Sequence, residues 1–182
     1  LDLCMEALIS GATFVARTFS GDIKQMKQLI KAAVMHDGIS VIDVISPCVT
    51  FNNKDEAMQS YTWGRENEAP LQDIRFVYKD ELSELDDFRE GDVQEVGMPD
   101  GSMILLKKID RDYDPTNRRS ALDLLTESYK DHYFATGLIY IEACQETVHD
   151  HFNLVDEPLN RLTPDRLRPS EESLAALNAA FV

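Results

Sequence analysis

The first 45 residues alternate between helical and β-prone segments, and this alternation constrains the fold more than any other feature of the chain. A helical apolar pattern ends at Gly11, and a second helix with apolar residues at three- and four-residue spacings opens at Ser20-Gly21-Asp22. The predicted order is helix, strand, helix and buried strand, over residues 1–10, 12–17, 22–36 and 39–45. Because two strands that flank a crossover helix run parallel in one sheet, we expect an α/β fold with a parallel sheet.

The remainder of the chain predicts a less regular set of elements. Pro99-Asp100-Gly101 separates two β-prone runs and indicates a hairpin. Ser170 opens a terminal helix that places Leu174, Leu177 and Phe181 on one face. The elements predicted after residue 53 are a helix, an acidic loop or short helix, two hairpin strands, a helix, a strand and the terminal helix, over residues 54–66, 79–92, 93–96 with 102–109, 117–131, 137–141 and 170 onward.

The composition excludes several classes of protein. The 182 residues include 33 acidic and 18 basic side chains, for a net charge of −15, which argues against binding to nucleic acid or to anionic membranes. No apolar run approaches the ~20 residues that span a bilayer, and no basic-then-apolar leader is visible. Three cysteines without a repeating spacing do not predict a disulfide framework, so we expect a reducing, cytoplasmic location.

Cys48 is the most informative single residue. It follows the strand predicted over 39–45, and Pro47 stops that strand because proline fixes φ and lacks an N–H. Open α/β sheets bind ligands at the carboxyl ends of their strands, so this position suits a ligand-binding thiol. The alternative is packing, since most free cysteines behave as small buried hydrophobes. Cys4 lies in an apolar helical stripe, so we expect it to pack in the core. Nothing marks Cys144 as a ligand.

The four histidines are weaker candidates. On a strand, His149 and His151 would share a face and could bind a metal, but their polar surroundings favour a solvated surface. His36 and His132 lie near predicted helix ends, where a cationic side chain interacts favourably with the helix dipole. No catalytic residue and no phosphate-binding glycine loop is assigned from the sequence.

Nine segments form a recognisable set, residues 11–17, 19–22, 42–52, 99–102, 106–108, 112–116, 136–140, 157–159 and 167–170. The block made by the first three is quite specific, and it includes the sequence Ser46-Pro47-Cys48-Val49-Thr50-Phe51-Asn52. Taken together, these segments resemble one family, the β subunits of 2-oxoacid:ferredoxin oxidoreductases, in the part that follows their thiamine-diphosphate motif. The similarity runs over nearly the whole chain.

The resemblance implies a fold, a function and a site. It implies that residues 1–53 are the carboxyl-terminal half of a thiamine-diphosphate-binding α/β domain of the pyrophosphate-binding type, and that residues 54–182 are a carboxyl-terminal extension. It implies oxidative decarboxylation of a 2-oxoacid, with 2-oxoglutarate favoured, to an acyl-CoA, with electron transfer to ferredoxin. The implied cofactors are thiamine diphosphate, magnesium and one 4Fe–4S cluster, and Cys48 would be the last ligand of that cluster.

The chain also departs from the family pattern. The Cys-x-x-Cys pair, a third cysteine and the Gly-Asp-Gly segment for magnesium and pyrophosphate are absent from the sequence, which starts without Met inside a helical pattern. We therefore expect upstream sequence that supplies them. The alternative is a non-catalytic assembly fragment that binds no complete cofactor. We expect Trp63, Phe76 and the terminal helix either to contact an α subunit or a symmetry mate, or to cover their own domain.

Overall fold

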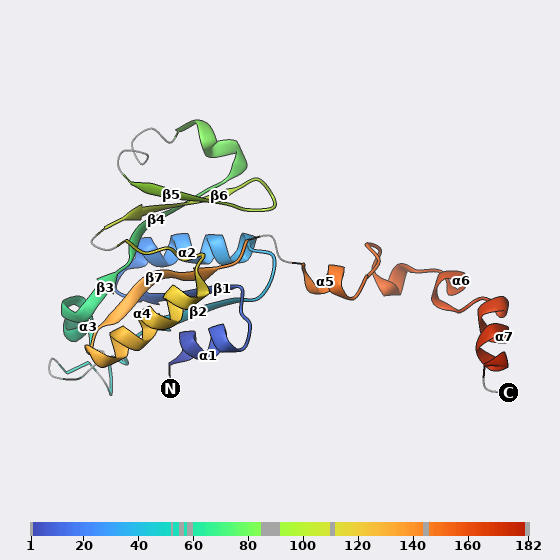
Figure 1. Ribbon diagram of the computed structural model, residues 1–182, viewed down its shortest axis with the longest axis horizontal. Coiled ribbons are helices and arrows are strands. Elements are labelled where there is room, and N and C mark those ends of the chain that lie inside the picture. Colours follow the sequence, from blue (N-terminus) through green and yellow to red (C-terminus); the bar gives the residue numbers. More distant parts are fainter. Residues whose placement is uncertain are drawn as a thin grey trace. The chain divides into compact units, whose positions relative to one another are not determined.

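The structure is a computed structural model that describes residues 2–51, 53–54, 57, 60–84, 92–109, 112–143 and 146–180 (Figure 1). The chain forms two compact units, Leu1–Gln145 and Glu146–Val182. The division that the sequence predicts after residue 53 falls within the first unit, and it stays a prediction.

The first unit is built on a four-stranded mixed sheet. In spatial order its strands are β2 (Ser40–Ile45), β1 (Phe14–Phe19), β7 (Phe134–Ile141) and β3 (Glu68–Pro70). Strands β1 and β2 are parallel, as the sequence predicts, and β3 is parallel to β7. Strand β7 runs antiparallel to β1, which makes the sheet mixed. The predicted α/β fold with parallel strands is confirmed.

Helices cover both faces of this sheet (Figure 1). Helix α2 (Ile23–Met35) lies on one face, and α1 (Leu3–Ile9) and α4 (Arg118–Lys130) lie on the other. Each helix begins at a polar cap whose side chain accepts backbone N–H groups, and the caps are Asp2, Asp22 and Asn117. The helices predicted over 1–10, 22–36 and 117–131 are therefore confirmed.

Two apolar cores lie against opposite faces of the sheet. Alternate residues of β1 contribute to each, because successive strand side chains point to opposite faces. Phe14 packs toward α2 with Leu29 and Leu138, whereas Val15 packs toward α1 and α4 with Leu125. These five side chains are fully buried. Burial of each such side chain stabilises the fold by about 1.5–3 kcal/mol.

Two strands differ from their predicted form. Strand β1 extends two residues past Arg17, the last residue of the predicted strand, because the Arg17 charge is paired within the sheet. Strand β2 was predicted to be buried, and this is wrong: Ser40 and Val44 are exposed and its other residues are half-buried. The reason is topological, since β2 lies at the edge of the sheet and pairs with β1 alone among the strands that the structure describes.

A second, three-stranded antiparallel sheet packs against α2. Its order is β4 (Gln72–Val77), β6 (Met103–Lys108) and β5 (Val93–Gly97). The predicted hairpin is confirmed as β5 and β6, and Gly101 in its turn has φ +86, which glycine adopts without strain. Strand β4 and the short β3 were not predicted. Phe76 is buried in the core between β4 and α2, so it covers its own unit rather than a partner.

The helix between β2 and β3 is shorter than predicted. Helix α3 (Tyr61–Asn67) starts only after Ser60, whose hydroxyl accepts the N–H of Trp63. The helix predicted over 54–66 is therefore correct only in its second half. The 3₁₀ helix η1 (Lys79–Glu84) begins the predicted acidic loop or short helix, and residues 85–91 lie outside the described residues.

The second unit contains only short helices. They are α5 (Val148–His151), η2 (Leu159–Arg161), α6 (Pro164–Leu167) and α7 (Glu171–Ala179). Helix α7 confirms the predicted terminal helix and its Ser170 cap, whereas Phe181 lies outside the described residues. Leu174 and Leu177 are exposed. None of the helices that the structure describes is long and apolar enough to cross a membrane.

His36 ends α2 in a buried position. Its Nε2 lies 2.8 Å from Thr13 Oγ1, its ring packs on Phe14, and its Nδ1 is buried with no hydrogen-bond partner among the described residues. Burial lowers the pKa of His36, although Asp37 opposes this effect. The expected cationic interaction with the helix dipole is therefore disfavoured at this position.

We expect the wild-type protein to lose stability relative to His36→Gln as the pH falls below about 6.5. In the unfolded chain His36 takes up a proton near that pH, whereas the folded chain takes it up at lower pH. The unfolded state then binds more protons and is favoured. Urea unfolding of both proteins from about pH 7.5 to about pH 5 measures the difference. Parallel curves of stability against pH for the two proteins would contradict a lowered pKa of His36 in the folded protein.

Candidate functional site

Cys48 lies on the loop that follows β2, as the sequence predicts. Its side chain is exposed, whereas the preceding Pro47 is buried and anchors the loop. Val49 and Phe51, in the turn that comes next, are 73% and 85% exposed. The thiol is therefore accessible within an exposed, partly apolar segment.

The neighbourhood of Cys48 does not complete a metal site. Within the described ranges, no three His, Cys, Asp or Glu side chains come together in a way that could hold a metal ion. A 4Fe–4S cluster takes four thiolates. The exposed Cys48 thiol fits one of these positions, and the other three ligands would have to come from outside the described residues.

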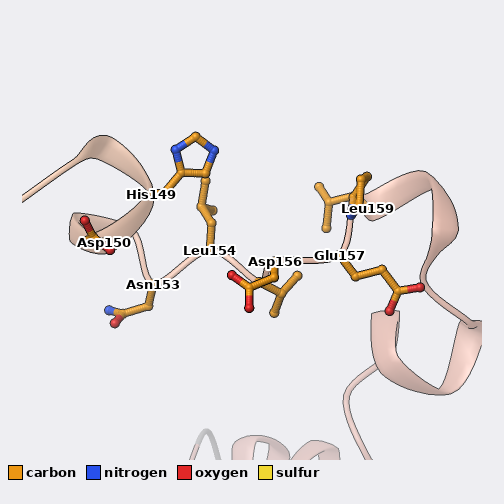
Figure 2. Close-up of a pocket in the computed structure, with 9 residues that line it drawn as sticks. His149, Asp150, Asn153, Leu154, Asp156, Glu157 and Leu159 are labelled. Atoms are coloured by element: carbon orange, nitrogen blue, oxygen red, sulfur yellow. The ribbon is translucent and has the colours of Figure 1, made fainter. Parts of the chain in front are cut away.

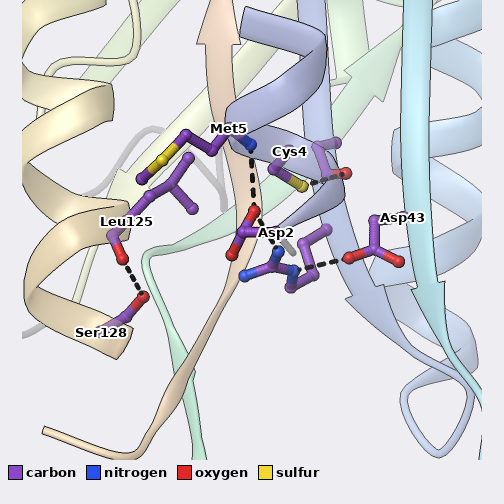
Figure 3. Close-up of polar contacts among 8 residues, drawn as sticks. Asp2, Cys4, Met5, Asp43, Leu125 and Ser128 are labelled. Atoms are coloured by element: carbon purple, nitrogen blue, oxygen red, sulfur yellow. Dashed lines mark hydrogen bonds and ion pairs between the residues drawn. The ribbon is translucent and has the colours of Figure 1, made fainter. Parts of the chain in front are cut away.

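Cys4 is a packing residue, as expected. It is fully buried in α1, and its thiol donates to the carbonyl oxygen of Ala16 at 3.7 Å (Figure 3). Burial raises the pKa of the Cys4 thiol to about 12, although the nearby Arg17 opposes this effect. Cys4 is therefore a protonated thiol at neutral pH and a poor ligand. Cys144 lies outside the described residues.

The sheet face below α1 carries a buried ion-pair triad of Arg17, Asp2 and Asp43. Arg17 Nε donates to Asp43 Oδ2 at 2.9 Å, and its Nη2 donates to Asp2 Oδ1 at 2.8 Å (Figure 3). Arg17 and Asp43 are direct partners in the parallel register of β1 and β2. Their side chains are only 6% and 12% exposed. Asp2 Oδ1 also accepts the N–H of Met5, so it caps α1 as well.

A cavity of about 600 Å³ opens beside this triad, over the later halves of β1 and β2. Trp63 of α3 and Phe134 of β7 form an aromatic wall of it, and their rings stack at 5.6 Å with an interplanar angle of 18°. Tyr129 and Tyr133, at the end of α4 and the start of β7, also line it. Pockets at the carboxyl ends of parallel strands are frequent ligand sites in α/β proteins. Trp63 thus packs within its own unit.

This triad was not predicted from the sequence. The available signal was a single charge in the middle of each of two apolar runs, Arg17 and Asp43. A charge buried in a strand needs an opposite charge, and two strands predicted to be parallel neighbours supply one each. The ion pair between Asp2 and Arg17 could not be predicted from the sequence, because it depends on where α1 packs.

A second hollow lies entirely within the second unit, between α5 and η2 (Figure 2). His149 and Asp150 line it, together with the segment from Asn153 to Leu159. His149 and His151 lie in helix α5 and not on a strand, so at two positions apart they do not share a face. Both are exposed, which agrees with the solvated surface that the sequence favours. The described residues bring no metal-binding group together there.

Comparison with known proteins identifies relatives of this chain. No protein-family model matches it. Over 47 residues it is 51% identical to the 2-oxoacid:ferredoxin oxidoreductase subunit beta of Sulfolobus sp and 49% identical to that of Saccharolobus solfataricus. It is also 30% identical over 87 residues to the 2-oxoglutarate synthase subunit KorB of Methanocaldococcus jannaschii. This aligned segment covers 46% of this chain and 32% of that protein.

The chain is related to the β subunits of 2-oxoacid:ferredoxin oxidoreductases. These relatives are subunits of oxidoreductase enzymes, and the resemblance read from the sequence is confirmed.

The structure agrees with this relationship at the level of fold. A solved chain of the 2-oxoglutarate:ferredoxin oxidoreductase from Magnetococcus marinus, bound to 2-oxoglutarate, coenzyme A and succinyl-CoA, superimposes with a TM-score of 0.59 at 20% identity. The match covers 97% of this chain and 44% of the solved one. The segments aligned with the Sulfolobus and Saccharolobus subunits span 26% of this chain and 15% of each relative.

Proposed function

We propose that this chain is part of the β subunit of a 2-oxoacid:ferredoxin oxidoreductase. In this proposal the complete enzyme decarboxylates a 2-oxoacid oxidatively, forms an acyl-CoA and transfers electrons to ferredoxin in the cytoplasm. Residues 1–53 belong to the thiamine-diphosphate-binding domain and residues 54–182 to its extension. The proposal is supported by the identity to the archaeal β subunits and by the shared fold.

Within this function, we assign Cys48 as one ligand of a 4Fe–4S cluster. The observation that carries the assignment is its exposed thiol on a loop held by the buried Pro47, just past the end of β2. When bound, thiamine diphosphate with magnesium supplies the decarboxylation chemistry, and the cluster passes single electrons. The remaining thiolates and the pyrophosphate site would come from elsewhere in the enzyme. Cys48 itself would hold one iron and tune its potential through its surroundings.

The partners follow from the same proposal. They are the α subunit of the enzyme, ferredoxin, the 2-oxoacid and coenzyme A. The terminal helix is a candidate contact with the α subunit, since Leu174 and Leu177 on α7 are exposed. The alternative function is a non-catalytic assembly fragment that keeps the fold without a complete cofactor.

The name of one relative and that of the solved enzyme favour 2-oxoglutarate as the substrate. We expect the purified full-length enzyme, with coenzyme A, to reduce ferredoxin with a kcat/KM for 2-oxoglutarate about tenfold or more above that for pyruvate. Anaerobic ferredoxin reduction with each substrate measures this ratio. A preference for pyruvate would contradict the substrate assignment alone. A full-length protein that binds no complete cofactor and reduces no ferredoxin with any 2-oxoacid would favour the assembly fragment.

A further inference from the structure

Three polar side chains from three elements form an incomplete ring of hydrogen bonds at the edge of the first core. The Thr136 hydroxyl of β7 donates to Glu68 Oε1 of β3 at 2.7 Å. Gln25 Nε2 of α2 donates to Thr136 Oγ1 at 3.3 Å. The other amide atom, Gln25 Oε1, is buried and has no hydrogen-bond partner among the described residues.

This orphaned oxygen requires a donor. A buried acceptor without one costs about 1–3 kcal/mol, so native structures satisfy nearly all of them. Turning the Gln25 amide over does not remove the conflict. Its Oε1 would then face Thr136 Oγ1, whose single proton is already donated to Glu68. The missing proton therefore has to come from another group at this site.

We propose that Glu68 in its neutral, protonated form donates to Gln25 Oε1 and closes this ring. The ring then acts as a pH-sensitive contact that holds β3 in place behind Phe134 and Trp63, which line the cavity beside Arg17. A neutral carboxyl supplies one O–H donor and keeps an acceptor oxygen. In the closed Glu68 ring, Glu68 donates to Gln25, Gln25 donates to Thr136, and Thr136 donates to Glu68. Each of the three side chains gives one hydrogen bond and receives one.

The electrostatic surroundings support the neutral form. Burial raises the pKa of Glu68, and the negative charge of Asp22 raises it further, whereas the hydrogen bond from Thr136 lowers it. Asp22 is the cap of α2 and is the charged group that acts on Glu68 from that helix. Strand β7 presents the uncharged Thr136 and Phe134 to β3.

The Glu68 ring lies where it can control the aromatic wall of the cavity. Glu68 pairs with Phe134 in the register of β3 and β7. Its backbone N–H also donates to the carbonyl oxygen of Gly64 and ends α3, the helix that carries Trp63. Trp63 in turn stacks on Phe134. Ionisation of Glu68 removes the hydrogen bond to Gln25 and adds repulsion with Asp22, which loosens β3 and the wall that α3 and β7 form.

The first test compares the full-length wild-type protein with Glu68→Gln, whose amide can make the same ring at every pH. The stabilising contribution of neutral Glu68 is complete below its unfolded pKa of about 4.5 and is lost as the pH rises through the higher folded pKa. We therefore expect Glu68→Gln to become more stable than the wild type as the pH rises. Infrared difference spectra between the two proteins should contain the C=O band of a protonated carboxyl that disappears over the same range. A wild-type advantage at high pH would overturn the proposal.

The second test separates the ring from simple burial. Gln25→Leu removes the acceptor but leaves the site apolar. The Glu68 ring predicts that the infrared titration midpoint of Glu68 then shifts to lower pH, because the neutral acid loses its partner. Burial alone predicts an unchanged or higher midpoint, and that result would overturn the proposal.

The third test addresses the aromatic wall formed by Trp63 and Phe134. It also tests the alternative that a divalent cation, and not a proton, binds at Glu68. Trp63 is the single tryptophan of the 182 residues, so the fluorescence difference between wild type and Trp63→Phe reports on this wall. We expect this difference to change with pH at the same midpoint, and to be constant in Glu68→Gln. Excess Mg²⁺ or Ca²⁺ should leave the midpoint unchanged. A pH-independent signal, or a midpoint lowered by the cation, would overturn the proposal.

Discussion

Replacement of Arg17 by Leu should destabilise the protein by about 3–5 kcal/mol, which is the usual cost of removing one partner from a buried charge group. The Arg17 side chain is 6% exposed and donates to both Asp2 and Asp43. Without it, the Asp43 carboxylate, only 12% exposed, stays in the sheet opposite an apolar residue. Urea unfolding of the purified protein near neutral pH measures the loss.

A double variant distinguishes charge from packing. In Arg17→Leu with Asp43→Val, the buried charges of the β1–β2 pair are both replaced by apolar side chains, and such replacements are often neutral or stabilising. Asp2 is 21% exposed and still accepts the N–H of Met5, so it remains the cap of α1. We expect the double variant to recover most of the loss. A single variant that loses less than about 1 kcal/mol would show that the triad is screened as surface pairs are.

Helix α2 and the β5–β6 hairpin could be predicted because the residues that determine them are close together in the sequence. The 3.6-residue apolar period predicts α2, and Asp22 at its start accepts the N–H groups of Lys24 and Gln25. Pro99-Asp100-Gly101 likewise predicts the turn of the β5–β6 hairpin, where Asp100 accepts the N–H of Ser102.

The missed features depend on contacts far apart in the chain. Gln72 donates to the carbonyl oxygen of Leu138, and Gln25 to Thr136, so polar residues of β4 and α2 attach to a strand that comes much later. Residues of β4 alternate between buried and exposed from Gln72 to Phe76. This pattern is too short to predict a strand from the sequence by itself. The edge position of β2 depends on the order of the strands in the sheet, and a local apolar pattern does not predict that order.

The same division applies to the candidate site. The position of Cys48 on a loop after a strand follows from Pro47 and the preceding β-branched run, and the structure has it there, exposed. The Arg17 triad joins three segments, and the position of Asp2 in it follows from the packing of α1 against α4 and the sheet. Helical packing of this kind is a tertiary effect.

Replacement of Cys48 by Ser should have the largest effect on activity. If Cys48 is one of four thiolate ligands, its loss opens the cluster, and the bound iron and its visible absorption should fall together. Changes in the outer shell of a metal site typically cost about 10–100-fold in affinity or activity, so loss of a direct ligand should lower ferredoxin reduction by about 100-fold or more. Cys4→Ala is the matched control, because Cys4 is buried and protonated.

The most direct measurement is the iron content of anaerobically purified full-length protein, with ferredoxin reduction measured on the same samples. We predict full iron and activity in the wild type, retention of both in folded Cys4→Ala, and loss of both in folded Cys48→Ser. Full iron and undiminished ferredoxin reduction in Cys48→Ser would contradict the assignment of Cys48 as a cluster ligand.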